Sequence, residues 1–317
     1  MAEPTRIAVA DLGTNSTRLL IAELAPDGAL RELARRTTVT RLGEGVDAGG
    51  RLGDAAMERV HAALTEYREL AEHHAVTRSL AVATSAVRDA DNGDLFVEHV
   101  RERDGFDLRV ISGDEEARLT FLGATAGRPP TAGMTTLVID IGGGSTEYVA
   151  GEPGSPPSFH VSTRLGSVRQ TERHLTGDPP APEELQALAD AARESVAAAV
   201  PEEIRSSVGS CIAVAGTATS LAAIDQQLVP YAPERVHGYR LLLGECERML
   251  ARLAAVDVEA RREVPGLHPD RAPTILAGVV ILIESMRLLG LESVETSEAD
   301  ILEGAALDAV PQRGDTG

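Results

Sequence analysis

The chain has 317 residues, of which 43% are hydrophobic, so it is long and apolar enough to form two packed domains of about 150 residues each. Its formal net charge of −19 argues against general nucleic-acid binding, which draws on broad basic surfaces. The 30 basic residues are all arginine, which excludes catalysis by a P-loop lysine or a Schiff-base lysine.

Cysteine content and apolar runs indicate where the protein works. Cys211 and Cys246 are too few and too far apart for a disulfide framework or a zinc cluster, so we expect buried free thiols. The N-terminal sequence lacks the character of a signal peptide. The longest apolar run, residues 275–283, is well short of the ~20 residues that cross a bilayer, so we expect a core helix there. These features predict a soluble, cytoplasmic protein without membrane partners.

A first polar turn lies between two predicted strands, at residues 7–10 and 18–24. The turn reads Asp-Leu-Gly-Thr-Asn-Ser-Thr over residues 11–17. Backbone amides of a glycine turn, together with neighbouring hydroxyl groups, can bind phosphate oxygens. The candidate phosphate ligands in this turn are Gly13, Thr14, Asn15 and Ser16. Arg18, at the start of the return strand, is either a clamp for an oxyanion or a cap on the strand face.

The next segments alternate between helix and strand, which favours an α/β fold. A helix from Asp54 to about residue 74 has a buried apolar stripe, and we expect its His61 at the surface. A strand at residues 80–83 leads into a polar stretch, where open α/β sheets commonly bind ligands. Arg88 in this stretch is either a cation for a bound phosphate or a surface arginine.

An acidic cluster opens the following helix. Ser112 or Asp114 can cap it, and a negative charge in the first turn suits the helix dipole. That structural reason is sufficient to explain Glu115 and Glu116 from the residues alone.

The polar turn recurs in the second half of the chain, after a predicted linker at residues 127–135. Residues 140–146 read Asp-Ile-Gly-Gly-Gly-Ser-Thr and also follow an apolar strand. The glycines permit a turn with positive φ, and their amides predict a phosphate nest. The predicted nest comprises Gly142, Gly143, Gly144 and Ser145. Asp140 offers an oxygen to a hard cation, and Asp11 occupies the same place in the first turn. We therefore expect two similar lobes whose turns face a common cleft.

A third glycine turn and a group of arginines complete the polar motifs. Gly216 and Thr217 follow a predicted strand and open a helix, whose N-terminus can hold another phosphate or the edge of a nucleotide. Three arginines are either ligands for distal phosphates or a solvated helix face; they are Arg164, Arg169 and Arg173. The chain ends in a strand at residues 293–296 and a helix that begins near residues 297–300.

Five of these motifs occur together in one known family. They are Asp-Leu-Gly-Thr-Asn-Ser (11–16), Ala-Thr-Ser-Ala-Val-Arg (83–88), Ser-Gly-Asp-Glu-Glu-Ala-Arg (112–118), Asp-Ile-Gly-Gly-Gly-Ser-Thr-Glu (140–147) and Gly-Thr-Ala-Thr (216–219). The combination resembles the exopolyphosphatase/guanosine-pentaphosphate phosphohydrolase (Ppx/GppA) family. The resemblance implies a two-lobed α/β fold of the actin-like (ribonuclease H-like) ATPase class, with the active site in the interdomain cleft. The implied lobes are residues 1–128, with the helix at 298–310 as a candidate addition, and residues 129–297, followed by a disordered tail at 311–317.

The resemblance also implies an activity, the hydrolysis of the terminal phosphoanhydride of inorganic polyphosphate with Mg²⁺ or Mn²⁺. Glu116 matches the family's catalytic glutamate, which activates the attacking water, and Glu115 is the fallback assignment. Asp140 would position the metal, whereas Asn15 and Arg88 would neutralise the charge of the phosphate.

Some alternatives remain open at this point. Longer members of the family continue with a helical HD-type region, and this chain ends before it, which favours short polyphosphate chains. A homodimer is expected from the resemblance alone. The alternative substrate is pppGpp, with ppGpp as a related ligand. Two alternatives belong to other functional classes. One is an ATP-dependent sugar kinase or chaperone-like ATPase, and the other is a non-catalytic sensor that closes on its ligand.

Overall fold

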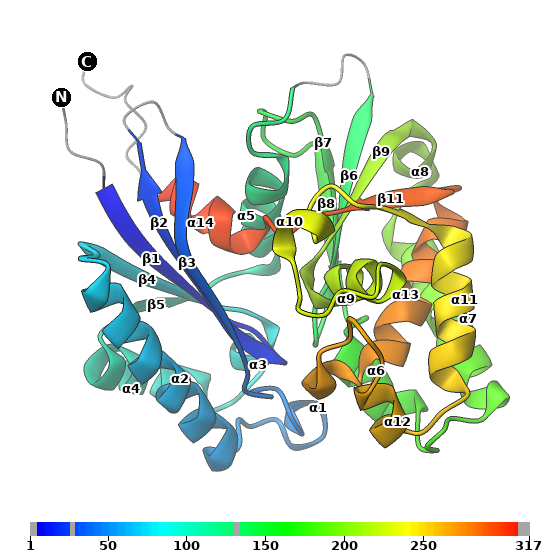
Figure 1. Cartoon of the computed structure of the whole chain (residues 1–317), viewed down its shortest axis with the longest axis horizontal. Coiled ribbons are helices and arrows are strands. Elements are labelled where there is room, and N and C mark those ends of the chain that lie inside the picture. The colour runs from blue at the N-terminus through cyan, green and yellow to red at the C-terminus, as the bar shows by residue number, and fades with distance from the viewer. Residues whose placement is uncertain (1–4, 26–28, 130–133, 310–317) are drawn as a thin grey trace. The chain divides into compact units, whose positions relative to one another are not determined.

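The computed structural model describes residues 5–25, 29–129 and 134–309. Residue contacts divide the chain into two compact units, with residues 1–126 and 300–317 in unit 1 and residues 127–299 in unit 2. Each unit consists of one mixed β-sheet and its helices (Figure 1). The tail predicted to be disordered, 311–317, and residues 130–133 of the predicted linker lie outside the described residues.

The sheet of unit 1 has five strands in the order β3-β2-β1-β4-β5. The strands are β1 (Thr5–Leu12), β2 (Ser16–Leu24), β3 (Leu30–Val39), β4 (Arg78–Ala83) and β5 (Asp107–Val110). β1, β2 and β3 form an antiparallel meander, and β4 and β5 extend the other side of β1 in parallel. Since β1 is central, its residues from Ile7 to Leu12 are buried.

Helices cover both faces of this sheet. Along β1, Ala8 and Ala10 pack toward α2 residues such as Leu64, whereas Ile7 and Val9 pack toward α14. The helical segments of unit 1 are α1 (Val46–Gly49), α2 (Asp54–His73), α3 (Ser85–Arg88), α4 (Gly93–His99), the π-helix η1 (Val100–Asp104), α5 (Gly113–Thr125) and α14 (Ile301–Asp308).

The sheet of unit 2 has six strands in the order β10-β11-β9-β6-β7-β8. The strands are β6 (Thr135–Ile141), β7 (Thr146–Gly151), β8 (Phe159–Thr163), β9 (Val208–Val214), β10 (Arg240–Leu242) and β11 (Ser293–Thr296). The sequence analysis did not predict β10, a three-residue edge strand with one buried side chain, Leu241. Such a short segment has too little periodicity to identify.

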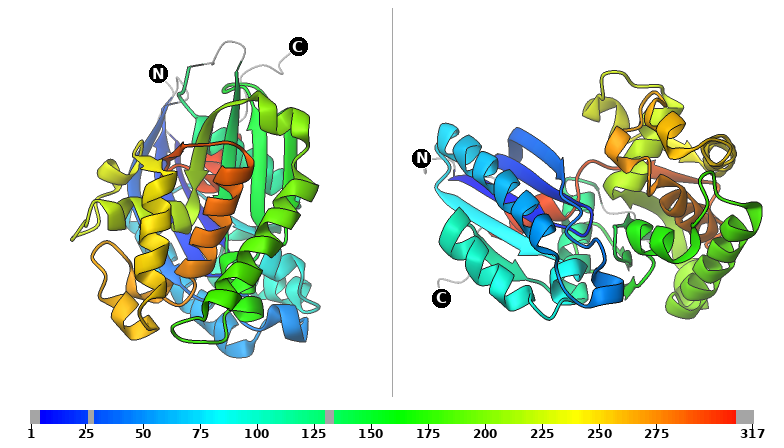
Figure 2. Two further views of the ribbon diagram at one scale, coloured as in Figure 1. Left: turned by 90° about the vertical axis from the view of Figure 1, so that its right-hand side faces the viewer. Right: turned by 90° about the horizontal axis from the view of Figure 1, so that it is seen from below.

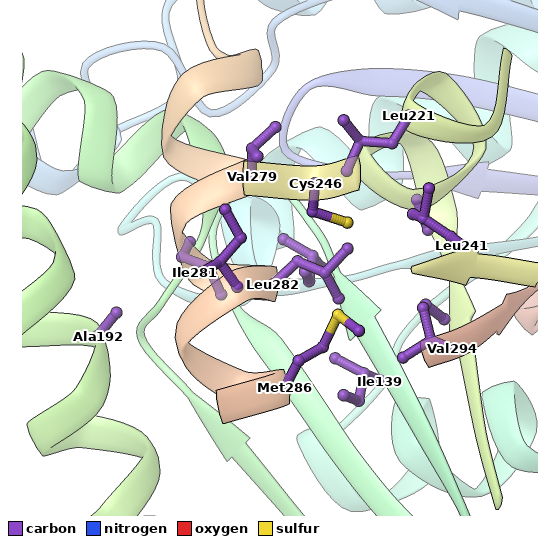
Figure 3. Packing of buried hydrophobic residues seen from close by; sticks show 14 of the residues in the cluster. Ile139, Ala192, Leu221, Leu241, Cys246, Val279, Ile281, Leu282, Met286 and Val294 are labelled. Carbon is purple, nitrogen blue, oxygen red and sulfur yellow. The ribbon is translucent and has the colours of Figure 1, made fainter. Parts of the chain in front are cut away.

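The core of unit 2 is built around α13 (Ile275–Leu288). Nearly all its side chains are buried, which confirms the predicted core helix at 275–283. α13 packs between α7 and α11, and Figure 2 shows these three helices side by side. In Figure 3, Leu282 and Met286 point toward Ile139 of β6. The helical segments of unit 2 are α6 (Ser167–His174), α7 (Pro182–Ala199), α8 (Glu202–Ser207), α9 (Ala215–Asp225), α10 (Pro233–Val236), α11 (Leu243–Ala254), α12 (Val258–Arg262), η2 (Pro269–Arg271) and α13.

The two sheets repeat one topology. Strands β3-β2-β1-β4-β5 of unit 1 correspond to β8-β7-β6-β9-β11 of unit 2, and in both the first three strands are antiparallel. This is the strand order of the actin-like, ribonuclease H-like class that the resemblance implied. Cys211 and Cys246 are buried free thiols, as expected. Within the described ranges, no helix is both long and apolar enough to cross a membrane.

The prediction that His61 lies at the surface is wrong. Its side chain is buried, and its Nδ1 lies 2.6 Å from Oδ2 of Asp104 in η1. The ring also packs against Phe96. Polarity alone suggested exposure, whereas an acidic partner 43 residues further along the chain allows the imidazole to be buried.

Candidate functional site

The turn between β1 and β2 is closed by a hydrogen bond of 3.0 Å from the Gly13 N–H to the Ser16 carbonyl. Behind it, segment 40–43 donates three backbone N–H groups to the carbonyl oxygens of Thr14 and Asn15, at 2.8 to 3.1 Å. In a trans peptide, the N–H of the next residue points opposite to the carbonyl. The amides of Asn15 and Ser16 therefore point away from segment 40–43.

The turn between β6 and β7 is built in the same way. The Gly142 N–H donates to the Ser145 carbonyl at 3.0 Å. Behind the turn, the first backbone N–H groups of α6 donate to the carbonyl oxygens of Gly142 and Gly143, at 2.9 to 3.1 Å. The N-terminus of α6 is thereby satisfied by the turn, since its first amides have no partner within the helix.

Arg169 of α6 completes this support. Its Nε donates to the Gly144 carbonyl at 2.9 Å, and its side chain is buried. With three successive carbonyls held from behind, the amides of Gly143, Gly144 and Ser145 all point away from α6. In the described part of the chain none of these three amides donates a backbone hydrogen bond. They form the kind of nest that binds anions, whereas the N–H of Gly142, which the predicted nest also included, instead closes the turn.

The turn glycines serve close packing rather than an unusual backbone angle. The prediction of positive φ is wrong for Gly142, and Gly13 does not adopt it either. A Cβ on Gly13 would lie 3.1 Å from the Ser16 carbonyl oxygen, and one on Gly142 would lie 3.3 Å from that of Ser145. The closing hydrogen bond brings this carbonyl back over the glycine, which leaves little room for a side chain.

The supporting segments contain residues that the sequence analysis missed. Segments 40–43 and 163–166 both read Thr-Arg-Leu-Gly; the first directly follows β3, and the second begins at the last residue of β8. A Cβ on Gly43 would lie 2.2 Å from Cγ2 of Thr14, and a Cβ on Gly166 would lie 2.1 Å from the Gly143 carbonyl oxygen. These glycines let the supporting segments approach the turns. The repeated tetrapeptide was the signal that could have identified them.

Asp11 lies next to Arg18 across the β1–β2 hairpin. Nε and Nη2 of Arg18 both donate to Oδ2 of Asp11, at 3.0 and 2.7 Å, and Nη1 donates to Asp300. Asp11 Oδ1 is buried and accepts no hydrogen bond from the described residues. Burial raises the pKa of Asp11, although Arg18 opposes this effect. The guanidinium of Arg18 thus contacts two carboxylates, which is a different position from the predicted phosphate clamp.

Asp140 has a different neighbour across its hairpin. The β6–β7 register places it opposite Glu147, and both side chains are buried. Glu147 accepts a hydrogen bond of 2.7 Å from the Ser162 hydroxyl. Cβ atoms of directly opposed residues lie only about 4.5–5.5 Å apart, so two carboxylates share this end of the hairpin. The sequence analysis did not single out Glu147, although the strand alternation places it beside Asp140.

Glu116 and Arg88 come together in unit 1. Ser112 caps α5, since its hydroxyl accepts from the Glu115 N–H at 3.2 Å, and this fixes the first turn of the helix. Glu116 is buried there, and its Oε2 accepts from Nη1 of Arg88 at 3.1 Å. Glu115 instead pairs with Arg118 at 2.9 and 3.0 Å, which lowers the pKa of Glu115.

The third predicted turn opens α9. Ala215 has a φ of +62°, a strained value for a non-glycine residue. The guanidinium of Arg271 lies against Gly216, where an added Cβ would come within 1.1 Å of Nη1. Thr217 is buried and packs on Gly278 of α13. The guanidinium of Arg271 therefore lies beside the N-terminus of α9, where a positive charge would favour a bound anion. The Thr217 side chain instead packs into the core.

The remaining arginines separate into two kinds. Arg169 is the buried support of the second turn described above. Arg164 and Arg173 are exposed. Only for these two does the choice between distal-phosphate ligand and solvated face stay open.

Comparisons with known proteins agree with this architecture. The sequence profile described as the Ppx/GppA phosphatase family matches residues 7–313. The chain belongs to the Ppx/GppA phosphatase family. Exopolyphosphatase 2 of Mycobacterium tuberculosis is 39% identical to it, over 96% of this chain and 98% of the relative. Exopolyphosphatase 1 of the same organism is 31% identical, over 98% of this chain and 90% of the relative.

Solved structures of Ppx/GppA proteins have the same fold. The crystal structure of the Aquifex aeolicus family member has a TM-score of 0.79 and 30% identity, and covers 96% of this chain and 97% of that one. An exopolyphosphatase from Cytophaga hutchinsonii has a TM-score of 0.85 and 25% identity, covering 97% and 99%. The predicted family, the actin-like fold and the enzyme class, a phosphatase, are thereby confirmed. The roles of individual residues in this Ppx/GppA chain stay predictions.

Proposed function

We propose that this protein is an exopolyphosphatase, which releases orthophosphate from the end of inorganic polyphosphate with the help of a divalent cation. The observation that carries the proposal is the second turn. Three amides, of Gly143, Gly144 and Ser145, face one side, and the buried carboxylates of Asp140 and Glu147 lie on the adjoining strand ends. Amides suit phosphate oxygens and carboxylates suit a hard cation, which together match a metal-bound phosphate chain.

Glu116 acts as the general base in this proposal. It accepts a proton from the attacking water while the water oxygen bonds to the terminal phosphorus. The bridging P–O bond breaks, and the shortened polyphosphate leaves. Arg88 donates to the Glu116 carboxylate at 3.1 Å, and the family resemblance gives its charge the role of neutralising the phosphate. Glu115 is the poorer candidate, because both of its carboxylate oxygens accept from Arg118 and its side chain is more exposed than that of Glu116.

Mg²⁺ or Mn²⁺ is the proposed cofactor. The carboxylates of the second turn fit such an ion, because Asp140 and Glu147 lie opposite each other across the β6–β7 hairpin and are both buried. When bound, the ion would neutralise phosphate charge and orient the terminal group.

The proposal further includes a homodimer in the cytoplasm. These parts rest on the family resemblance. Light scattering of the purified protein tests the dimer, and a monomeric mass would remove it.

Orthophosphate release from three substrates tests the function. Short polyphosphate, long polyphosphate and pppGpp are compared at equal concentrations of terminal phosphate, with Mg²⁺ and with EDTA. We expect metal-dependent release from polyphosphate. Dominant turnover of pppGpp would assign the protein to alarmone metabolism through the same site, and no release from any of the three would refute the proposed hydrolysis.

A further inference from the structure

The Asp11 carboxylate is held in one orientation by a chain of contacts within unit 1. Both donors from Arg18 go to the same oxygen, Oδ2, so Oδ1 is left without a hydrogen-bond partner among the described residues. The exposed fractions of the two side chains are 16% for Arg18 and 7% for Asp11. Two hydrogen bonds to one oxygen fix the carboxylate and direct Oδ1 away from the guanidinium.

Arg18 is itself held by Asp300, the N-cap residue of α14. Nη1 of Arg18 donates to Oδ2 of Asp300, whose side chain is only 2% exposed. The pKa of Arg18 reflects this arrangement, because burial would lower it, yet Asp300 and Asp11 together raise it. The guanidinium is therefore permanently charged and bridges the two aspartates.

Asp300 in turn is fixed by the first turn of α14. Its Oδ1 accepts from the Leu302 N–H at 3.1 Å, and its own N–H donates to Oε2 of Glu303 at 2.9 Å. This is a reciprocal capping box. The helix thus determines the rotamer of Asp300, and Asp300 determines where Arg18 can lie.

Glycines bring α14 close to α5, the helix that carries Glu116. A Cβ on Gly123 would lie 1.8 Å from the Asp300 carbonyl oxygen, and one on Gly304 would lie 1.8 Å from that of Leu119. The two helices therefore cross with their backbones in contact. The position of Asp300 relative to α5 is consequently fixed by packing that allows little movement.

We propose that Asp300 is a positioning residue for the reaction, which through Arg18 holds Oδ1 of Asp11, a buried oxygen without a hydrogen-bond partner in the described residues, in its working orientation. The inference rests on the proposed function, since Asp11 belongs to the first phosphate turn. Asp300 touches neither substrate nor metal in this account. Its contribution is to keep Arg18 on Oδ2 of Asp11, so that Oδ1 keeps one position at the first phosphate turn.

The test uses Asp300→Asn, with Asp300→Ser as a second variant. Both keep a residue that caps helices well. Asparagine presents to Arg18 either an N–H₂ group or a neutral oxygen, and serine is too short to reach the guanidinium. Each variant therefore weakens the contact with Arg18 but retains α14. Because small displacements of reacting groups can cost ~10²-fold in rate, we expect kcat for polyphosphate to fall at least about tenfold with KM within about twofold.

Glu303→Gln is the matched control, because Gln can keep the capping box and loses only the ion pair with Arg35. We expect its kcat to equal that of the wild type. A lower Tm for both Asp300 variants with an unchanged kcat for the folded enzyme would overturn the inference, since it would leave Asp300 a purely structural role.

A readout that does not depend on activity separates this inference from the proposed function. The Nε–H of Arg18, assigned by its loss in Arg18→Gln, should give a slowly exchanging NMR signal in the wild type and in Glu303→Gln, and a faster-exchanging one in Asp300→Asn. Equal exchange in all three would contradict the positioning. If the NMR result holds but the wild type hydrolyses no polyphosphate, the proposed function fails and the proposed role of Asp300 in that reaction fails with it.

Discussion

The two phosphate turns share one backbone design but differ in the residue that faces their aspartate. Asp11 lies opposite Arg18, whereas Asp140 lies opposite Glu147. An arginine neutralises the first aspartate, and a second carboxylate adds to the negative charge beside the other. Duplicated hairpins have thus acquired different electrostatics. We expect the cation to bind at the second turn. At the first turn, where Arg18 offsets the charge of Asp11, we expect the phosphate to be bound without a cation.

The largest expected effect separates the two aspartates. Asp140→Asn removes a carboxylate from the second turn, where Glu147 rather than an arginine lies opposite it. A catalytic cation contributes several kcal/mol, so we expect kcat to fall about 10³-fold, together with weaker binding of Mn²⁺. The matched Asp11→Asn should lose less activity and little Mn²⁺ affinity. Steady-state kinetics and a Mn²⁺ titration measure both, and an equal loss of Mn²⁺ affinity in the two variants would contradict the division of roles.

The next prediction concerns the glycines behind the turns. Gly166→Ala would place its Cβ 2.1 Å from a backbone oxygen, that of Gly143, so the turn itself must move. In Gly43→Ala the nearest atom, at 2.2 Å, is a side-chain methyl group, Cγ2 of Thr14, which has more freedom. Overpacking costs about 1–3 kcal/mol, and we expect Gly166→Ala at the upper end with the larger loss of kcat/KM. Urea denaturation measures the loss of stability in both variants, and steady-state kinetics measure the loss of kcat/KM. Larger losses in Gly43→Ala than in Gly166→Ala would contradict this prediction.

Much of this design could be predicted from the sequence, because it is local. The apolar runs that end in Asp11 and Asp140 predict strands, and the repeated glycine turns predict the paired hairpins. The repeated Thr-Arg-Leu-Gly segments could also have been identified, but the contacts of Arg18 and Arg169 could not be predicted, since they depend on tertiary packing. Arg18 and Asp300 are 282 residues apart in the chain.

Two further residues show why pattern alone misleads. His61 looks like a surface residue until its partner Asp104 is located. Arg169 was predicted either to bind a distal phosphate or to lie on a solvated helix face, but its guanidinium donates to the Gly144 carbonyl. Burial of a charged or polar group depends on its partner, and helical periodicity carries no information about partners on other elements.

A smaller effect concerns a contact that only the first turn has. Thr14 and Ser85 form a buried hydroxyl pair at 2.9 Å, and Gly143 occupies the place of Thr14 in the second turn. Thr14→Val leaves the Ser85 hydroxyl without this partner and should destabilise the protein by about 1–3 kcal/mol. Adding Ser85→Ala should recover part of that loss. Additive losses in the double-mutant cycle would exclude a coupled pair.

The smallest effect is a pH dependence at the first turn. Burial raises the pKa of Asp11 above its usual value of 3.8. Its contribution to stability is therefore present below that pH and lost as the pH rises through its pKa in the folded protein. Asp11→Asn has no such loss, so relative to the wild type it should gain stability as the pH rises, by about 1.4 kcal/mol for each unit separating the folded and unfolded pKa values. Urea denaturation from pH 3.5 to 7 measures this, and a constant difference would contradict it.

The most direct test of the whole account compares Glu116→Gln with Glu115→Gln. Both remove one carboxylate from the first turn of α5, and orthophosphate release from short polyphosphate is measured with saturating Mg²⁺. General-base catalysis contributes about 10²–10⁴-fold, so Glu116→Gln should lose that much of kcat while it keeps its fold and KM. Glu115→Gln should stay within about threefold of the wild type, because its carboxylate is engaged by Arg118. A Glu116→Gln enzyme as active as the wild type would contradict the central claim.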